Sequence, residues 1–319
     1  MKATAIAYPI QGLIKYHGLK DRKLRIPFHD SISVCTAPLH TKTTVEFGYG
    51  KDEALIDGSP VSGDEMRRIL NVVDPLRKLA GEESGMRMVS KNNFPSNIGL
   101  GASSSGFAAL ALATCACLGL KMDLERVSTF ARRGAGSASR SVTGGFSRWF
   151  AGSDDRSSVS RRIPSPAEKD MCMVVALIPA KKYTEVAHEE VLTSPFFKAR
   201  LEYVDPALDE MEDAIRRGDV DRIGELAERD TLLLHGITMT GIDKIILWRP
   251  ETLSVLLEVR RMREEGIGCY FSIDTGATVY INTTRKWIGT VKERIESLGI
   301  PALVCDVGGE ARLVNDHLF

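Results

Sequence analysis

Apolar and polar positions along the chain mark out a series of helices and strands. The apolar spacing over residues 65–80 is typical of an amphipathic helix, and the apolar run at 107–120 predicts a buried helix that begins near Ser103. The stretch MCMVVALIPA, which starts at residue 171, is typical of a buried strand. CYFSIDTGATVYI, which starts at residue 269, predicts two strands joined by a turn.

The order of these elements predicts the fold class. The first third of the chain is rich in short strands, with β-branched and aromatic residues at 43–47, and Asp123 is placed to cap a helix over 126–133. The second half alternates strands with further helices, which we expect at 205–217, 220–233, 251–265 and 285–298. This alternation predicts an α+β protein built of two layers.

A polar segment divides the chain near its middle. The sequence SDDRSSVSRRIPSPAEKD, residues 153–170, contains two prolines and little that could be buried. We therefore predict an N-terminal domain over 1–168 and a C-terminal domain over 169–319. An exposed loop or β-hairpin inside a single domain is the alternative interpretation of the same segment.

Charge and cysteine content exclude several classes of partner. The chain has 42 Lys and Arg residues against 42 Asp and Glu residues among 319, and no basic block stands out. We therefore expect no nucleic-acid partner and no membrane-surface partner, and an anionic substrate must be met by a few placed cations. The six cysteines form no C-x-x-C pair and no zinc spacing, so we predict no metal site and reduced, buried thiols.

The apolar runs also predict where the protein is found. The longest run falls short of the roughly 20 residues that a membrane span needs. The N-terminal sequence MKATAIAYPIQG is interrupted by Pro9 and Gly12, and it is typical of a strand rather than a signal peptide. We expect a cytoplasmic protein.

One glycine- and serine-rich segment could bind phosphate. In FPSNIGLGASSSGFAALALA, residues 94–113, glycines precede a helix whose free N–H groups favour an anion. The segment lacks the Gly-x4-Gly-Lys-Ser/Thr pattern of a P-loop, and an ordinary helix entry remains the alternative. The candidate phosphate-loop residues are Gly99, Gly101, Ser103, Ser104 and Ser105.

Three other segments carry single charged residues in suggestive places. RRGAGSASRSVTGGFSRW, residues 132–149, contains Arg140, and a guanidinium can grip a carboxylate or phosphate with two parallel hydrogen bonds. In IKYHGLKDRKLRIP, residues 14–27, Lys15 follows an apolar strand, whereas the remaining cations are expected on the solvated surface. Asp274 lies between a strand and a glycine turn, where it is either a turn former or a placed acid or base.

Taken together, these segments resemble the mevalonate diphosphate decarboxylases of the GHMP kinase superfamily. TAIAYPIQGLIKYHG is similar to the family's opening strand, which ends in Lys-Tyr-Trp-Gly, and IPFHDSISV is similar to its second strand. RRGAGSASRSVTGGFSRW resembles its Arg-x-Gly-Ser-Gly-Ser-Ala-Cys-Arg-Ser segment, and LTSPFF resembles its Thr-Ser-Pro motif. The phosphate loop and the Asp274 segment complete six motifs in the family's order.

The resemblance implies a fold and a reaction. The fold is GHMP-kinase-like, with an N-terminal domain related to ribosomal protein S5 domain 2 and a ferredoxin-like C-terminal domain. The family phosphorylates the 3-hydroxyl of a mevalonate ester and then eliminates that phosphate with loss of carbon dioxide. By resemblance, Arg140 would hold the substrate carboxylate, Lys15 the departing phosphate, and Asp274 would stabilise positive charge at C3 or accept the hydroxyl proton.

The resemblance also implies the remaining contacts and the assembly. Family motifs place a further set of side chains at the substrate: Tyr16, His17, Ser137, Ser139, Ser194 and Thr275. The partner is a small phosphorylated mevalonate, and the family suggests a homodimer.

The chain departs from the family where the nucleotide would bind. Ile10 stands where the family has an asparagine near the terminal phosphate and metal, and Ala102 replaces one of two adjacent serines of the loop. Just before the loop, Asn97 and Ile98 replace two small alanines. These changes favour a protein that has lost its need for ATP.

The chain also departs from the family at the C5 end of the substrate. Ala135 replaces a serine that faces the diphosphate, Leu19 replaces a lysine, and His17 replaces a tryptophan. Each lost charged contact weakens binding by roughly 1.5–3 kcal/mol. One phosphate at C5 is therefore easier to satisfy than two.

Both sets of departures fit one branch of the family. Mevalonate 3,5-bisphosphate decarboxylase receives a substrate already phosphorylated at C3 and releases isopentenyl phosphate in a modified mevalonate pathway, with no required cofactor. The alternative is an ATP- and Mg²⁺-dependent decarboxylase of mevalonate 5-diphosphate or 5-phosphate. A mevalonate kinase of the same fold and a non-catalytic binding protein are further alternatives, and neither would release carbon dioxide.

Overall fold

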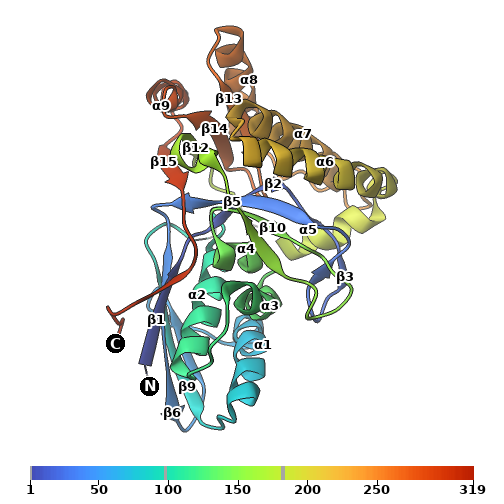
Figure 1. Ribbon diagram of the computed structural model, residues 1–319. Helices are drawn as coiled ribbons and strands as arrows, with labels where there is room; N and C mark the ends of the chain where they lie inside the picture. The colour runs from blue at the N-terminus through green and yellow to red at the C-terminus, as the bar shows by residue number, and fades with distance from the viewer. Residues whose placement is uncertain (1, 97–98, 181–183) are drawn as a thin grey trace.

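The N-terminal half is a sheet covered by helices. The computed structural model describes residues 2–96, 99–180 and 184–319. Its first sheet has the strand order β16 (Arg312–Val314), β1 (Lys2–Ala7), β6 (Thr41–Tyr49), β9 (Gly85–Asn92), β7 (Glu53–Ile56) and β8 (Ser59–Pro60). The helices of this half are α1 (Gly63–Ala80), α2 (Ala102–Cys117), α3 (Leu124–Gly134) and α4 (Ala138–Thr143). Helix α2 packs on β1 and β6 and contacts the other three helices (Figure 1).

A second sheet joins the two halves. Its strand order is β11 (Ser160–Ile163), β10 (Phe146–Trp149), β5 (Ser31–Ala37), β15 (Ala302–Val307), β12 (Met171–Ala176), β14 (Val279–Thr284) and β13 (Cys269–Ile273), and β2 (Ile10–Ile14) also pairs with β5. Strands β3 (Leu19–Asp21) and β4 (Ile26–Pro27) form a separate pair. Because β5 pairs with β15, the strand of one half continues into the sheet of the other.

The C-terminal part of this sheet has ferredoxin-like topology. Strands β12 to β15 are antiparallel and lie in the order β15-β12-β14-β13. The short helix α5 (Thr184–Glu190) and the longer helices α6 (Phe197–Arg217), α7 (Val220–Met239) and α8 (Pro250–Glu264) lie between β12 and β13 in the chain. Helix α9 (Ile288–Glu296) lies between β14 and β15. The predicted α+β, GHMP-kinase-like class is therefore confirmed, and its ferredoxin-like part is visible in the strand order.

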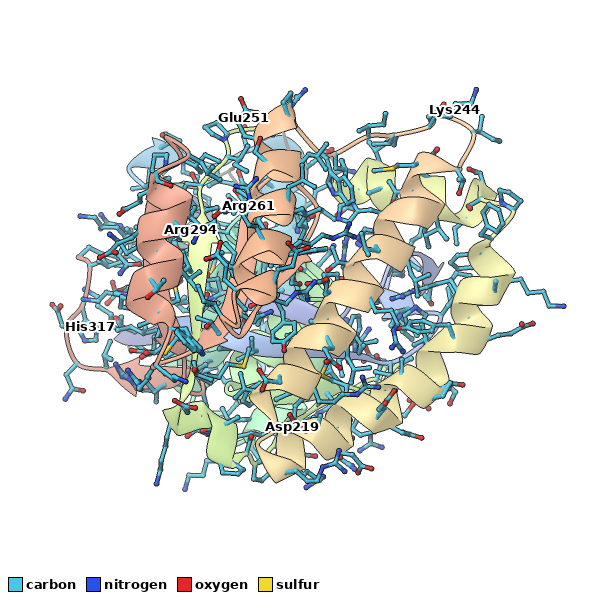
Figure 2. All side chains as sticks on the ribbon, turned by 90° about the horizontal axis from the view of Figure 1, so that it is seen from above. Asp219, Lys244, Glu251, Arg261, Arg294 and His317 are labelled. Carbon is cyan, nitrogen blue, oxygen red and sulfur yellow. The ribbon has the colours of Figure 1, made fainter. Side chains whose placement is uncertain are left out.

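Alternating side chains of β12 hold these helices on opposite faces of the sheet. Val174 packs in a core with α8 and α9, whereas Met173 and Val175 pack in a core with α6 and α7. Figure 2 looks down on these helices, with Arg261 on α8 beside Arg294 on α9, and Asp219 where α6 meets α7. The Asp219 side chain accepts a hydrogen bond from the N–H of Arg222 and so caps α7.

Most predicted elements are present, and the differences have physical reasons. Asp123 caps α3 as predicted, since its carboxylate accepts the N–H of Arg126 at 2.7 Å. Helix α6 begins at Phe197 rather than near 205 and continues through Pro206, because Val204 on the earlier turn is fully buried in the core. The short helix α5 (Thr184–Glu190) was not predicted, and short 3-10 turns η1 (Pro166–Lys169) and η2 (Val191–Thr193) also occur.

The predicted domain boundary falls in a hairpin region. Strands β10 and β11 pair as antiparallel neighbours, so part of the segment 153–170 forms the hairpin of the alternative interpretation. The last strand, β16, pairs with β1 and so returns to the N-terminal half. A boundary at 168 stays a prediction. Within the described ranges, no helix has the length and apolar character that a membrane crossing requires.

Candidate active site

A cavity of about 650 Å³ lies where the two halves meet. The loop before α2, the start of α4, strand β2, helix α5 and the turn between β13 and β14 all contribute to its wall. Most of the predicted site residues line this one cavity: Lys15, Tyr16, His17, Gly99, Gly101, Ser103, Ser104, Ser137, Arg140, Asp274 and Thr275. Four segments that are distant in the sequence therefore meet at one place.

Lys15 is held in the wall by a set of buried polar groups. It follows β2 directly, and its Nζ donates to Thr231 Oγ1 and to Ser272 Oγ, each at 2.9 Å. The carboxylate of Asp230 lies 3.8 Å from Nζ. Burial lowers the pKa of Lys15, while the charges of Asp230 and Asp274 act to raise it. The ammonium group is thus positioned before any substrate binds.

A buried ion pair between Asp230 and Arg200 holds the backbone of Lys15 in place. Asp230 accepts the N–H of Lys15 at 3.0 Å and forms a buried ion pair with Arg200 at 2.6 Å. Arg200 also donates to the carbonyl oxygen of Lys15 at 2.7 Å. The sequence analysis missed this pair. The available signal was a charge, Asp230, spaced three and four residues from the core positions Ala227 and Leu234.

Asp274 lies at the turn between β13 and β14 and contacts the start of the chain. Its Oδ1 accepts the N–H of Gly12 at 3.1 Å. A Cβ at Gly12 would lie 2.7 Å from Cγ of Lys15 and 3.0 Å from Oδ1 of Asp274. Residue 12 must therefore be small for the ammonium and the carboxylate to keep their positions.

Gly12→Ala is expected to lower kcat about tenfold or more while leaving the melting temperature nearly unchanged. The added methyl must displace the side chains of Lys15 and Asp274, and small displacements of reacting groups are costly. Gly289→Ala in α9 is the matched control, because a Cβ there meets nothing within 4 Å. Equal turnover of the two variants, measured under saturating substrate, would contradict the proposed importance of this contact.

Arg140 is a buried cation with unused donors. It belongs to α4, only 2% of it is exposed, and its guanidinium lies 5.5 Å from the Tyr16 ring and 5.9 Å from the Trp149 ring. Within the described residues, its Nε and Nη1 have no hydrogen-bond partner. Burial lowers its pKa to about 10, so it stays protonated at neutral pH. Unpaired buried donors facing a cavity are suited to a bound anion.

Aromatic and imidazole rings form the wall beside Arg140. Tyr16 packs edge-on against Trp149 with ring centroids 4.7 Å apart, and it stacks on His188 at 5.1 Å. Burial lowers the pKa of His188 to about 4 and lowers that of His17 well below its usual range, where the neighbouring His188 adds to the effect. Both imidazoles are therefore neutral at pH 7. A Cβ at Gly136 would lie 2.3 Å from Tyr16 Oη, so this wall is closely packed.

The glycine-rich loop has the backbone that close approach to an anion requires. Gly99 has φ +88° and Gly101 has φ +73°, both in the left-handed region that glycine favours. Ser104 holds the loop, since its Oγ donates to the carbonyl of Gly101 at 2.6 Å and accepts the N–H of Ile10 at 3.2 Å. The family departures at Asn97 and Ile98 lie outside the described residues.

Three of the residues predicted to contact substrate do not line this cavity. None of these hydroxyls lines the cavity, because each is buried and bonded elsewhere. Ser105 pairs with Thr41 Oγ1 at 2.6 Å, and Ser139 donates to the carbonyl of Gly136 at 2.7 Å. Ser194 pairs with Thr240 Oγ1 at 2.7 Å. These hydroxyls support the loop, α4 and the segment before α6, and their contacts with substrate stay predictions.

Several charged residues that the sequence analysis missed do line the cavity. Arg25, which was expected on the solvated surface, lies in the cavity wall with Arg68 of α1. Two carboxylates, Glu65 and Glu185, line the same region. Over the described part of the chain, no group of three or more His, Cys, Asp or Glu side chains is arranged to hold a metal ion.

The GHMP-kinase-like fold and the cationic cavity between its halves define a class of enzymes that act on small molecules. Comparisons with known proteins identify the family within this class. Residues 7–160 match the family model described as the diphosphomevalonate decarboxylase-like N-terminal domain. The phosphomevalonate decarboxylase of Haloferax volcanii is 48% identical, over 99% of this chain and 98% of its own length. The chain belongs to the diphosphomevalonate decarboxylase family of carboxy-lyases, as its motifs predicted.

Solved structures agree with this assignment. The mevalonate diphosphate decarboxylase of Staphylococcus aureus superposes with a TM-score of 0.94 at 30% identity, covering 98% of each chain. The complex of MDDEF with MVAPP, AMPPCP and magnesium superposes with a TM-score of 0.93 at 29% identity, covering 99% of each chain.

Proposed function

We propose that this protein eliminates phosphate and carbon dioxide from a mevalonate that carries one phosphate on C3 and one on C5, which is mevalonate 3,5-bisphosphate, and releases isopentenyl phosphate. The observation that carries the proposal is the meeting of Lys15, Arg140 and Asp274 in one cavity. The relative that shares 48% identity is named phosphomevalonate decarboxylase, which agrees with a single phosphate at C5.

Each bond change or charge that develops in the proposed reaction is matched by one charged side chain of the cavity. The C3–O bond breaks, and its electron pair leaves with the phosphate, whose negative charge faces Lys15. Positive charge develops at C3, and the carboxylate of Asp274 stabilises it. The C1–C2 bond then breaks, its electrons form the C2=C3 double bond, and C1 leaves as carbon dioxide. Arg140 holds the substrate carboxylate until this bond breaks. Charges that are positioned before the reaction provide the largest part of such catalysis.

The charges and hydrogen-bond partners of these three residues support the roles proposed for them. The charge of Asp274 acts on both Lys15 and Arg140, so the three groups are close enough to influence one another. Arg140 has two unpartnered nitrogens in the described structure and matches a planar carboxylate with two parallel hydrogen bonds. Lys15 is a compact cation whose ammonium group is held by Thr231 and Ser272, which suits a tetrahedral phosphate.

A second candidate function is the same elimination with ATP as the source of the C3 phosphate. A second cavity of about 290 Å³ shares Ser103, Glu65 and Arg68 with the first, and Phe107 and Leu110 give it an apolar wall. A cavity of mixed lining with one apolar wall, beside a phosphate loop, could hold a purine base. Ser103 and the N-terminus of α2 would hold the nucleotide phosphates, and ATP would supply the phosphoryl group. Asp274 would then accept the proton of the C3 hydroxyl.

The two candidates differ in one measurement. Carbon dioxide release is followed from carboxyl-labelled mevalonate 3,5-bisphosphate without nucleotide and from labelled mevalonate 5-phosphate with and without Mg-ATP. Release from the bisphosphate alone supports the nucleotide-independent enzyme. Release from the 5-phosphate that requires Mg-ATP, with one ADP formed per carbon dioxide, supports the second candidate. No release from any of these reactions contradicts both.

The proposal includes the assembly and location predicted from the sequence. The family resemblance suggests a homodimer, and the composition favours a cytoplasmic protein without nucleic-acid or membrane partners. A small phosphorylated mevalonate is the proposed ligand, and the complex of MDDEF with MVAPP is a structural neighbour that supports it.

A further inference from the structure

Two arginines and two carboxylates form a further part of the cavity wall, and none of the four is among the main charges that act on Lys15. Arg25 lies in the turn between β3 and β4, and Glu185 lies on α5, which Figure 1 shows beside β3. Arg68 and Glu65 come from α1. Arg25 acts electrostatically on Tyr16, Arg68 and His188, so these groups form one connected cluster.

Arg25 has the features of an anion-binding residue. Its side chain is only 12% exposed, and its Nε is buried without a hydrogen-bond partner among the described residues. Its φ of +53° is in the left-handed region, which an arginine rarely adopts and which costs about 1 kcal/mol or more. A strained backbone that places a partly unpaired guanidinium in a cavity wall is a feature of binding sites rather than of solvated surface.

Glu185 limits the negative charge that a ligand can bring to this part of the cavity wall. Its carboxylate accepts a 2.8 Å hydrogen bond from Nη2 of Arg25, while its side chain is 58% exposed at the mouth. Partial burial acts to raise the pKa of Glu185, but the charge and hydrogen bond of Arg25 outweigh it, so the pKa is lowered and the group is a carboxylate at neutral pH. Glu65 adds a second carboxylate to the same wall.

The charge balance favours one phosphate. A phosphate monoester carries a charge of about −1.5 to −2 at pH 7, which two guanidinium groups can contact. Because Glu65 and Glu185 leave these four side chains without net charge, no positive charge remains to offset a second phosphate. A diphosphate would place its additional negative charge beside Glu185, and the family lysine that could offset it is Leu19 here. Leu19 lines a small neighbouring cavity together with Arg25, Glu185 and His188. Position 19 therefore still lies beside the proposed phosphate site, but it carries no positive charge.

Resting on the proposed function above, we propose that Arg25 and Arg68 bind the C5 phosphate and that Glu185 restricts this subsite to a monophosphate by repelling a second phosphate. The cation that recognises this end of the substrate thus comes from the β3–β4 turn. Glu185 keeps Arg25 in place and discriminates against the diphosphate, so the same ion pair provides both affinity and selectivity.

The chain contains a matched control for this ion pair. Arg22 and Glu189 join the same turn to the same helix, with Nη1 and Oε1 3.0 Å apart. Their side chains are 67% and 60% exposed, and neither residue lines the large cavity. Both residues line the small neighbouring cavity, so substitutions in this second pair change charge and helix contacts close to the first pair but outside the large cavity.

Binding of the two products tests the proposal independently of turnover. Isopentenyl phosphate and isopentenyl diphosphate are titrated by calorimetry into the parent protein and into Arg25→Gln, Glu185→Gln, Arg22→Gln and Glu189→Gln. We expect Arg25→Gln to weaken isopentenyl phosphate binding at least tenfold. We expect Glu185→Gln to shift the affinity ratio at least tenfold toward the diphosphate, while both control variants stay within about twofold of the parent. Thermal melting verifies that each variant is folded.

The outcomes separate this proposal from the proposed function. A parent protein that releases carbon dioxide from a 5-phosphorylated mevalonate but shows the same product ratio in Glu185→Gln and Glu189→Gln overturns the selectivity of Glu185 alone. Unchanged isopentenyl phosphate affinity in a folded Arg25→Gln overturns the role of Arg25. A parent protein that binds neither product and releases no carbon dioxide overturns both proposals.

Discussion

Asp274→Asn is expected to lower kcat by about 100- to 1,000-fold while the protein stays folded. The substitution keeps the size of the side chain and its acceptor oxygen for the N–H of Gly12, so the turn between β13 and β14 is preserved. It removes the negative charge that opposes the positive charge developing at C3. Removal of one preorganised electrostatic contact from an active site typically costs this much. Single-turnover kinetics of carbon dioxide release is the measurement.

Asp306→Asn is the control for this variant. Asp306 lies on β15 of the same sheet and pairs with Arg285 near the surface, outside the cavity. We expect it to keep parental turnover. An Asp274→Asn variant that retains more than a tenth of parental kcat, with an unchanged melting temperature, would remove Asp274 from the proposed catalytic set.

Arg140→Lys is expected to reduce kcat/KM by roughly 10- to 150-fold although the positive charge is kept. A lysine ammonium provides a single nitrogen where the guanidinium presents a planar set of donors, so the two parallel hydrogen bonds to a carboxylate are lost. One charged hydrogen bond is worth about 1.5–3 kcal/mol, which corresponds to this range. The shorter head group also loses the aromatic contacts with Tyr16 and Trp149.

Arg161→Lys serves as the comparison for Arg140→Lys. Arg161 is on β11, its side chain is 59% exposed, and it pairs with Glu125 on the surface. We expect this exchange to leave kcat/KM unchanged, since exposed ion pairs contribute little. If Arg140→Lys behaves like Arg161→Lys, Arg140 does not hold the substrate carboxylate through a bidentate contact.

The parts of the site that the sequence predicted are those set by local pattern. Lys15 follows an apolar strand, Arg140 follows a Gly- and Ser-rich turn, and Asp274 precedes a glycine turn between two strands. Each of these positions is determined by the element beside it. The order of the motifs then indicated a family, and the structure brings the three residues to one cavity.

The parts that the sequence did not predict depend on tertiary contacts. A serine hydroxyl can donate to many acceptors, and Ser105, Ser139 and Ser194 bond to groups that only the folded chain places next to them. Arg25 belongs to a run of cations with no apolar pattern, so nothing local separates it from its exposed neighbour Arg22. Only the packing of α5 against the β3–β4 turn shows which of these two arginines enters the cavity wall.

The same reasoning applies to the helix that supports Lys15. Proline is favoured in the first turn of a helix, so Pro206 by itself is compatible with the predicted start near 205. Arg200 lies before that proline and forms the buried ion pair with Asp230. The ion pair and the buried Val204 hold the preceding turns in helical form, which local propensity does not reveal.

The most direct test of the account is mass spectrometry of a reaction that contains purified protein, mevalonate 3,5-bisphosphate and no nucleotide. We predict isopentenyl phosphate and an equal amount of inorganic phosphate, and about a hundredth of these amounts or less with Asp274→Asn over the same initial period. This result would show that elimination requires Asp274 and needs no nucleotide once C3 carries a phosphate. Unchanged bisphosphate in a reaction with folded parental protein, or phosphate release without isopentenyl phosphate, would contradict the proposed elimination.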